Sequence, residues 1–101
     1  MDKPARVVIT GMGAVTPLGN DVSTTWKAMQ GGMSGAGPIT LFEHTDEFPS
    51  RIACEVKGLD PLEFLEKKEA RRFDRFTQLA IKAAEEALDD SGVRDKPEHI
   101  T

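Results

Sequence analysis

Arg6-Val-Val-Ile-Thr-Gly-Met-Gly-Ala-Val-Thr-Pro-Leu-Gly-Asn20 is the stretch of sequence that decides the fold. Residues 5–10 are mostly apolar, which is typical of a short strand buried on both faces of a sheet. Gly11 and Gly13 end this strand. Most of the glycines lie in the first third of the chain, whereas the last third has a helical pattern. This asymmetry indicates part of a larger α/β architecture rather than a closed small domain.

A first helix is expected directly after this stretch, over residues 22–30. Asn20 or Asp21 can cap its N-terminus, because a side-chain oxygen there accepts hydrogen bonds from early backbone N–H groups. The pair of glycines that follows the helix stops it. Trp26 and Met29 lie three positions apart and mark its inner face, which we expect to pack in the core.

The middle of the chain predicts a loop, a strand and a short helix. Residues 33–49 show no sustained period and contain many turn-forming residues, so we interpret them as a loop. Residues 51–56 are apolar enough to form a second strand. Asp60 and Pro61 are typical of an N-cap and a first helical position, because proline lacks the N–H that would be unsatisfied there. They predict a short helix over residues 61–72.

A longer helix is expected from about residue 74 to residue 90, with Gly92 as its C-terminal cap. Its apolar side chains recur at spacings of three and four and predict one buried face. These side chains are Phe73, Phe76, Ala80, Ala83, Ala84 and Ala87. The alanines suggest close packing against another element, such as the same helix in a partner subunit. Residues 96–101 resemble the lead-in to a further strand.

Composition limits the classes of function. The chain of 101 residues suits a single domain, but a hydrophobic content of 39% leaves a thin core for an independent fold. A formal charge of −4 argues against general nucleic-acid binding, which needs a basic surface. No apolar run approaches the roughly 18 residues of a membrane span. The N-terminus has no signal-peptide core and the single cysteine, Cys54, cannot form an internal disulfide, so we expect a cytoplasmic protein.

The Gly11-Met-Gly13 turn could open a dinucleotide-binding loop, because it follows an expected strand. That motif requires Gly or Ala at position 16 and a helix that begins at once. Thr16 occupies the position, and the Pro-Leu-Gly-Asn sequence after it delays the helix. The chain also contains no Gly-Lys-Ser/Thr phosphate loop. A tight strand exit is therefore the favoured interpretation, and no cofactor is predicted.

The cysteine and the histidines predict neither a nucleophile nor a metal centre. Cys54 lies in the second expected strand beside Glu55, whose charge favours the neutral thiol over the thiolate. We therefore expect a buried, inert cysteine. His44 and His99 are far apart in the sequence and lack neighbours at metal-ligand spacing.

A cluster of basic residues is the strongest functional signal from the residues alone. It comprises Lys67, Lys68, Arg71, Arg72 and Arg75. On one continuous helix, Lys68, Arg71, Arg72 and Arg75 would share one stripe. An N-cap at Asp74 would start a new helix and remove Arg75 from that stripe. Acidic residues lie among these positions, so a solvated helix face with internal ion pairs is the alternative interpretation.

The sequence as a whole resembles the start of a β-ketoacyl-acyl-carrier-protein synthase of the elongating, synthase II-like type. The similarity runs from the opening stretch through Thr25-Trp-Lys-Ala and Gly32-Met-Ser-Gly35 to Lys68-Glu-Ala-Arg-Arg-Phe-Asp74 and Asp90-Ser-Gly92. It covers nearly the whole chain. Residues 1–101 are therefore expected to be the N-terminal part of the ketosynthase N-terminal domain, truncated before the catalytic region. The resemblance implies a partial thiolase-like fold, from a layered α/β/α/β/α architecture, and a homodimer.

The reaction that this resemblance implies is the decarboxylative condensation of an acyl thioester with malonyl-acyl-carrier protein in fatty acid elongation. The family uses a cysteine nucleophile and histidines in motifs that residues 1–101 do not contain, so we expect the chain alone to be inactive. In this family a basic patch docks the acidic recognition helix of acyl- or malonyl-loaded acyl carrier protein. A residue-by-residue match assigns this role to Lys68, Arg71 and Arg72. The alternatives are a polyketide ketosynthase or chain-length-factor segment, and a non-catalytic carrier-protein-binding module.

Overall fold

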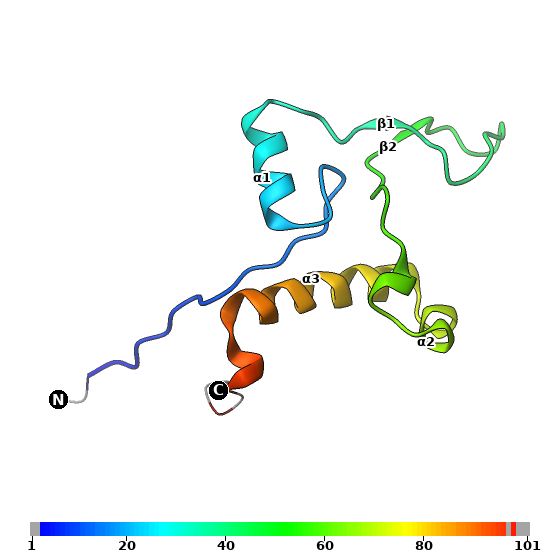
Figure 1. Cartoon of the computed structure of the whole chain (residues 1–101). Coiled ribbons are helices and arrows are strands. Elements are labelled where there is room, and N and C mark those ends of the chain that lie inside the picture. Colours follow the sequence, from blue (N-terminus) through cyan, green and yellow to red (C-terminus); the bar gives the residue numbers. More distant parts are fainter. Residues whose placement is uncertain (1–2, 97, 99–101) are drawn as a thin grey trace.

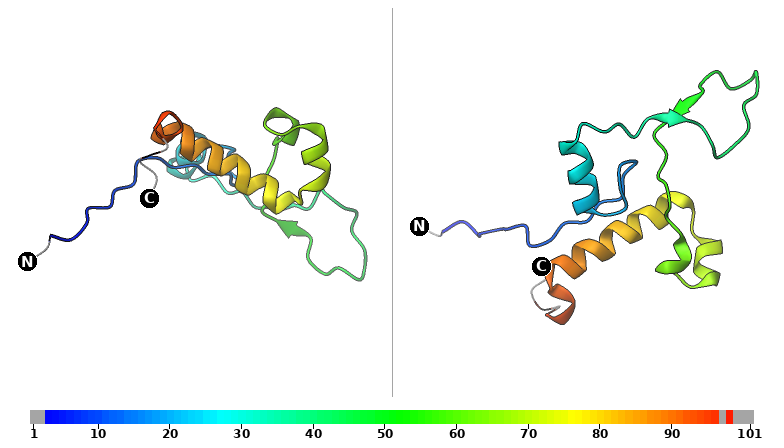
Figure 2. Two further views of the ribbon diagram at one scale, coloured as in Figure 1. Left: turned by 90° about the horizontal axis from the view of Figure 1, so that it is seen from below. Right: turned by 45° about the horizontal axis from the view of Figure 1, so that its top comes forward.

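The computed structural model describes residues 3–96 and 98 as an elongated mixture of helices and short strands (Figure 1). Its Cα radius of gyration is 17.9 Å, with extents of 64 × 37 × 26 Å, whereas a compact domain of this length has a radius of about 13 Å. The N-terminal segment leaves the body at one end and the β-hairpin projects at the other (Figure 2). The elements in chain order are α1 (Val22–Gln30), β1 (Gly37–Pro38), β2 (Ile52–Ala53), the 3₁₀ helix η1 (Pro61–Glu63), α2 (Lys67–Arg72), α3 (Arg75–Ser91) and the 3₁₀ helix η2 (Val93–Asp95).

The segment expected to form the first strand is extended but unpaired. Val7 is 91% exposed and Ile9 is 86% exposed, so the prediction of a strand buried on both faces is wrong for this structure. A strand forms only where a neighbouring strand accepts its backbone hydrogen bonds. Within the described residues the one sheet consists of β1 and β2, and neither reaches residues 5–10.

Helix α1 has the bounds expected from the sequence. Asp21 is its N-cap, and the Asp21 Oδ1 atom accepts a hydrogen bond from the Thr24 backbone N–H at 2.7 Å. This hydrogen bond holds the pKa of the Asp21 carboxyl below its usual value of 3.8. Gly31 ends the helix as its C-cap. The expectation that Trp26 and Met29 pack in a core is wrong, because each is 56% exposed.

The second expected strand is shorter than predicted and has an unexpected partner. Of residues 51–56, only β2 is a strand, and it pairs antiparallel with β1 inside the segment expected to be a loop. The Glu55 side chain closes the hairpin: its carboxylate accepts the Thr40 hydroxyl at 2.8 Å and the Thr40 backbone N–H at 3.2 Å. These hydrogen bonds, the hydroxyl first, lower the pKa of Glu55.

The helix expected over residues 61–72 is divided in two. Asp60 caps η1 as predicted, accepting a backbone N–H of that element at 2.9 Å. A second start follows at Glu66, whose backbone N–H donates to Glu69 Oε1 at 3.4 Å. This pairing of an N-cap residue with the third helical residue is a capping box. The capping box starts α2 as a separate helix, which explains why the expected helix is divided in two.

Helix α3 confirms the longest predicted element. Asp74 is its N-cap, and Gly92 ends it with a φ of 73°, a left-handed conformation that glycine adopts readily. The expected apolar face is only partly covered. Ala83 and Ala87 are partly buried, but Phe76 is 72% exposed and the other alanines of that face are exposed.

Within the described residues, α3 packs against the extended segment of residues 11–13 of the same chain. The turn expected at Gly11 and Gly13 is therefore wrong for this structure, in which the chain turns later, between Thr16 and Gly19. A Cβ atom added to Gly11 would lie 2.6 Å from the Ser91 backbone nitrogen, and one added to Gly13 would lie 2.8 Å from that of Ala87. Both distances are shorter than atoms tolerate. The two glycines therefore let the backbone pass directly across the alanines of α3.

Two carboxylates on α3, from Glu86 and Asp90, hold this crossing in place, and we term them the carboxylate clasp. Asp90 Oδ2 accepts the Met12 backbone N–H at 3.1 Å, and Glu86 Oε1 accepts that of Ala14 at 2.9 Å. Glu86 Oε2 also accepts the N–H of Val22 at 3.0 Å, at the start of α1. Glu86 and Asp90 lie four residues apart on a helix, and the amides of Met12 and Ala14 lie two residues apart on extended chain. Both spacings correspond to about 6 Å, so each carboxylate lies opposite one amide.

Replacing Glu86 with glutamine is expected to loosen the clasp. A neutral amide offers one acceptor oxygen where the carboxylate offers two, so the amides of Ala14 and Val22 should exchange with solvent about tenfold faster. Amide hydrogen exchange measures this change directly. Glu85→Gln is the matched control, since that carboxylate contacts Arg94 at the surface instead. Equal exchange rates in the two variants would contradict the assignment.

The described residues contain little core. Ile39, Leu59 and Gln78 are the residues buried within this part of the chain, and none of its large side chains is fully buried. The thin core expected from the composition is therefore observed. Of the expected lead-in over residues 96–101, residues 97 and 99–101 lie outside the described residues. None of the helices seen in residues 3–96 and 98 has the length and apolar character needed to cross a membrane.

Candidate functional site

The basic cluster lies on α2 and at the start of α3. Lys68, Arg71 and Arg72 all belong to α2 and are exposed. They occupy positions i, i+3 and i+4, which brings their side chains to neighbouring positions on one side of a helix. We term these three residues the basic patch.

Arg75 does not belong to the basic patch, because the chain breaks at Asp74 and a new helix begins. Both terminal nitrogens of the Arg75 guanidinium donate to the Leu59 backbone carbonyl, each at 3.3 Å. Nη1 also donates to Gln78 Oε1 at 3.3 Å. The break that the sequence allowed is therefore confirmed, and Arg75 has a structural role.

The charges of the basic patch have no ion-pair partner among the described residues. Both ion pairs found there use Arg94, which contacts Glu85 at 3.6 Å and Asp89 at 2.9 Å. Glu69, the acidic residue nearest to the patch within α2, bonds to the helix N-terminus. The face is solvated, as the alternative interpretation expected, but the internal ion pairs of that interpretation are absent from the described residues. The patch presents three exposed positive charges that form no ion pair within the described residues.

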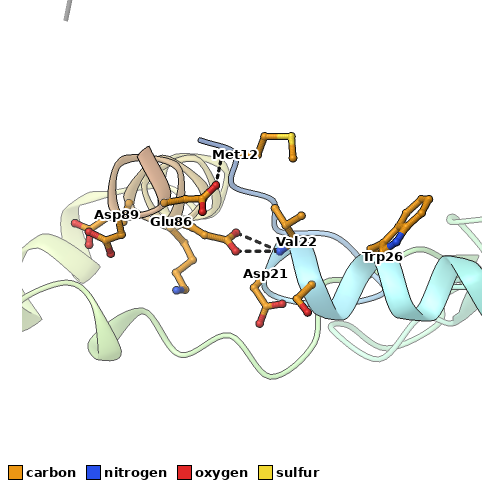
Figure 3. Close-up of a pocket in the computed structure, with 10 residues that line it drawn as sticks. Met12, Asp21, Val22, Trp26, Glu86 and Asp89 are labelled. Carbon is orange, nitrogen blue, oxygen red and sulfur yellow. Dashed lines mark hydrogen bonds between the residues drawn. The ribbon is translucent and has the colours of Figure 1, made fainter. Parts of the chain in front are cut away.

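A groove of about 920 Å³ lies between α1 and the acidic side of α3 (Figure 3). Met12, Val22 and Trp26 supply its apolar surface, and five carboxylates line it. Each carboxylate already has a partner: Asp21 caps α1, Glu86 and Asp90 form the carboxylate clasp, and Glu85 and Asp89 bind Arg94. Figure 3 shows Glu86 directed at Val22 rather than into open space. The groove is a structural junction and not a cation site.

Cys54 and His44 are both exposed in the structure. The expectation that the Cys54 thiol is buried is therefore wrong. The thiol is exposed because β2 ends at the preceding residue and no described element covers it. His44 is exposed in the hairpin loop, and His99 lies outside the described residues. Within residues 3–96 and 98, no cluster of His, Cys, Asp and Glu is arranged to hold a metal ion.

Sequence reasoning missed the residues that organise the structure around the site. Glu86 and Asp90 form one acidic pair spaced by four residues, and Glu85 and Asp89 form another. That spacing was a usable signal, because it places each pair on one face of α3. Gln78 gave no such signal, although it is the polar residue most deeply buried in the described structure.

Comparison with known proteins gives a consistent result. Residues 5–99 match the family model described as "Beta-ketoacyl synthase, N-terminal domain". Several proteins named 3-oxoacyl-[acyl-carrier-protein] synthase 2 are similar to this chain. The one from Coxiella burnetii (strain RSA 493 / Nine Mile phase I) is 49% identical over 88 residues, which cover 87% of this chain and 21% of the relative. That of Synechocystis sp. (strain ATCC 27184 / PCC 6803 / Kazusa) is 44% identical, covering 85% and 20%, and that of Staphylococcus aureus (strain COL) is 48% identical, covering 90% and 22%.

The chain thus spans about a fifth of the length of these relatives, with 20–22% of each covered. The match to the family model extends over nearly all of the chain and includes both the Gly-X-Gly sequence and the basic patch. The chain belongs to the β-ketoacyl synthase family, since its residues 5–99 match the model of that family's N-terminal domain.

Proposed function

We propose that this chain is the N-terminal part of a 3-oxoacyl-acyl-carrier-protein synthase that extends fatty acids. The observation that carries the proposal is the match of residues 5–99 to the ketosynthase N-terminal domain. Identities of 44–49% to proteins named as synthase 2 support the elongating type. In the whole protein we propose a thiolase-like α/β/α/β/α fold, a homodimer and a cytoplasmic location.

In the proposed reaction, an acyl group first moves from the carrier-protein thioester to a cysteine sulfur, which releases the carrier thiol. Malonyl-carrier protein then loses carbon dioxide, and the resulting carbanion attacks the acyl thioester. A carbon–carbon bond forms and the cysteine thiolate leaves. A nucleophile of this kind needs thiolate character. Cys54 is exposed on an extended segment and not at a helix N-terminus, so we propose that the catalytic cysteine lies in another part of the whole protein.

The role we propose for the chain itself is docking of acyl carrier protein. Lys68, Arg71 and Arg72 are exposed, lie on one side of α2 and have no described ion-pair partner. An acidic helix would gain charge complementarity there, which speeds encounter and fixes orientation. Such an interface weakens as salt rises, because exposed charges are screened.

A condensation assay on the full-length protein tests the proposed reaction. Acyl- and malonyl-loaded carrier proteins should yield one 3-oxoacyl product for each carbon dioxide released. The 101-residue chain is the matched control and should yield neither. Carbon dioxide release without the carbon–carbon bond would contradict the proposal. Carrier-protein binding with no reaction at all would favour a non-catalytic module.

A further inference from the structure

The elbow between α2 and α3 contains the one polar side chain that is buried within the described residues. Gln78 is 7% exposed and lies one turn into α3. A buried amide is costly unless its donors and its acceptor are all satisfied. The partners of Gln78 therefore indicate what this residue holds in place.

The Gln78 side chain binds the end of α2. Its Nε2 donates to the Ala70 backbone carbonyl at 2.9 Å and to the Phe73 carbonyl at 3.3 Å. Carbonyls in the last turn of a helix have no partner within that helix. A side chain of α3 thus supplies the C-terminal hydrogen bonds that α2 lacks, and it spans the break at Asp74.

The same amide is tied to the preceding segment through Arg75. Gln78 Oε1 accepts from Arg75 Nη1 at 3.3 Å, and the Arg75 guanidinium also binds the carbonyl of the buried residue Leu59. Both ends of the Gln78 amide are therefore used. The resulting network joins α2, α3 and the segment that leads into η1, close to the elbow seen in Figure 1.

This network bears on the basic patch because α2 has only six residues. Isolated helices shorter than about 12 residues are marginal in water, so α2 depends on its connections for both its form and its direction. Lys68, Arg71 and Arg72 extend from the helix that Gln78 fixes. We propose that Gln78 is a positioning residue that sets the angle at which the basic patch is presented to acyl carrier protein. This inference rests on the proposed docking function.

The test is Gln78→Met in the full-length enzyme, which keeps the side-chain length but removes the amide. The KM for the acyl-loaded carrier protein should rise about five- to tenfold, because a tenfold loss of affinity corresponds to the loss of about one or two hydrogen bonds. The kcat, and the KM for an acyl-pantetheine thioester without a carrier protein, should stay unchanged. Gln30→Met is the matched control, because Gln30 is an exposed residue at the end of α1, and it should alter neither KM.

An equal change in both KM values, or a change in kcat alone, would overturn the inference and make Gln78 a general structural residue. If Gln78→Met does not fold, Gln78→Asn gives the same comparison with the amide kept on a shorter stem. It should produce a smaller rise in KM that is again confined to the carrier-bound substrate, and an equal effect on both substrates would overturn the inference.

The inference can fail separately from the proposed docking function. If charge reversal in the basic patch weakens carrier-protein binding but Gln78→Met does not, only the positioning role is wrong. If charge reversal itself has no effect, the docking assignment is wrong and the positioning role with it.

Discussion

Replacing Gly13 with alanine is expected to dislodge the extended segment of residues 11–13 from α3 and to lower the free energy of unfolding by about 3 kcal/mol. The added Cβ would overlap the Ala83 backbone carbonyl and lie 2.8 Å from the Ala87 backbone nitrogen. Both atoms belong to the backbone of a 17-residue helix, so neither can move aside as a flexible side chain could. The displaced segment would also pull the Ala14 amide away from Glu86.

Urea unfolding of the full-length protein measures this effect, and Gly37→Ala is the matched control. Nothing lies within 4 Å of a Cβ added to Gly37, so its unfolding free energy should change by less than about 0.5 kcal/mol. If the two variants unfold at the same urea concentration, the packing of residues 11–13 against α3 is wrong.

Reversing the charge of the basic patch, with Lys68→Glu, Arg71→Glu and Arg72→Glu together, is expected to weaken carrier-protein binding at low salt by about a hundredfold or more. The patch has no ion-pair partner among the described residues, so the substitutions break no such contact within α2. The change should therefore appear as repulsion from the acidic partner, and the salt dependence of the dissociation constant should fall as well.

Titration calorimetry over a range of salt concentrations checks this result. Arg71→Glu compared with Lys27→Glu provides a matched pair, because each reverses one exposed charge and Lys27 lies on α1, outside the patch. Arg71→Glu should weaken binding and Lys27→Glu should leave it nearly unchanged. A triple variant that binds carrier protein as the parent does would exclude the docking role.

The parts of the fold that could be predicted from the sequence depend on short-range chemistry. Asp21, Asp60 and Gly92 act at helix ends as expected, because a cap involves only residues a few positions apart. The expected strand over residues 5–10 depends instead on a neighbouring strand. The apolar composition of this segment is visible in the sequence, but no strand that pairs with it is among the described elements. The exposure of Cys54 differs from the expectation for the same reason.

The candidate site shows a similar division. The residues and spacing of the basic patch could be predicted from the sequence. The possibility that Asp74 separates Arg75 from the patch could be predicted as well. The network around Gln78 could not be predicted, since it forms only when the end of one helix meets the start of the next. The clasp formed by Glu86 joins residues more than sixty positions apart, and no local pattern specifies such a contact.

The most direct test of the central claim is photo-crosslinking from the basic patch of the full-length protein. A benzoylphenylalanine placed at position 71 leaves Lys68 and Arg72, two of the three charges of the patch, in place. At low salt it should capture acyl carrier protein through its acidic recognition helix, and the yield should fall as salt rises. The same probe at position 30, on the exposed end of α1, should capture none. Capture at position 30 but not at position 71 would contradict the account, because the carrier protein would then dock on a different surface.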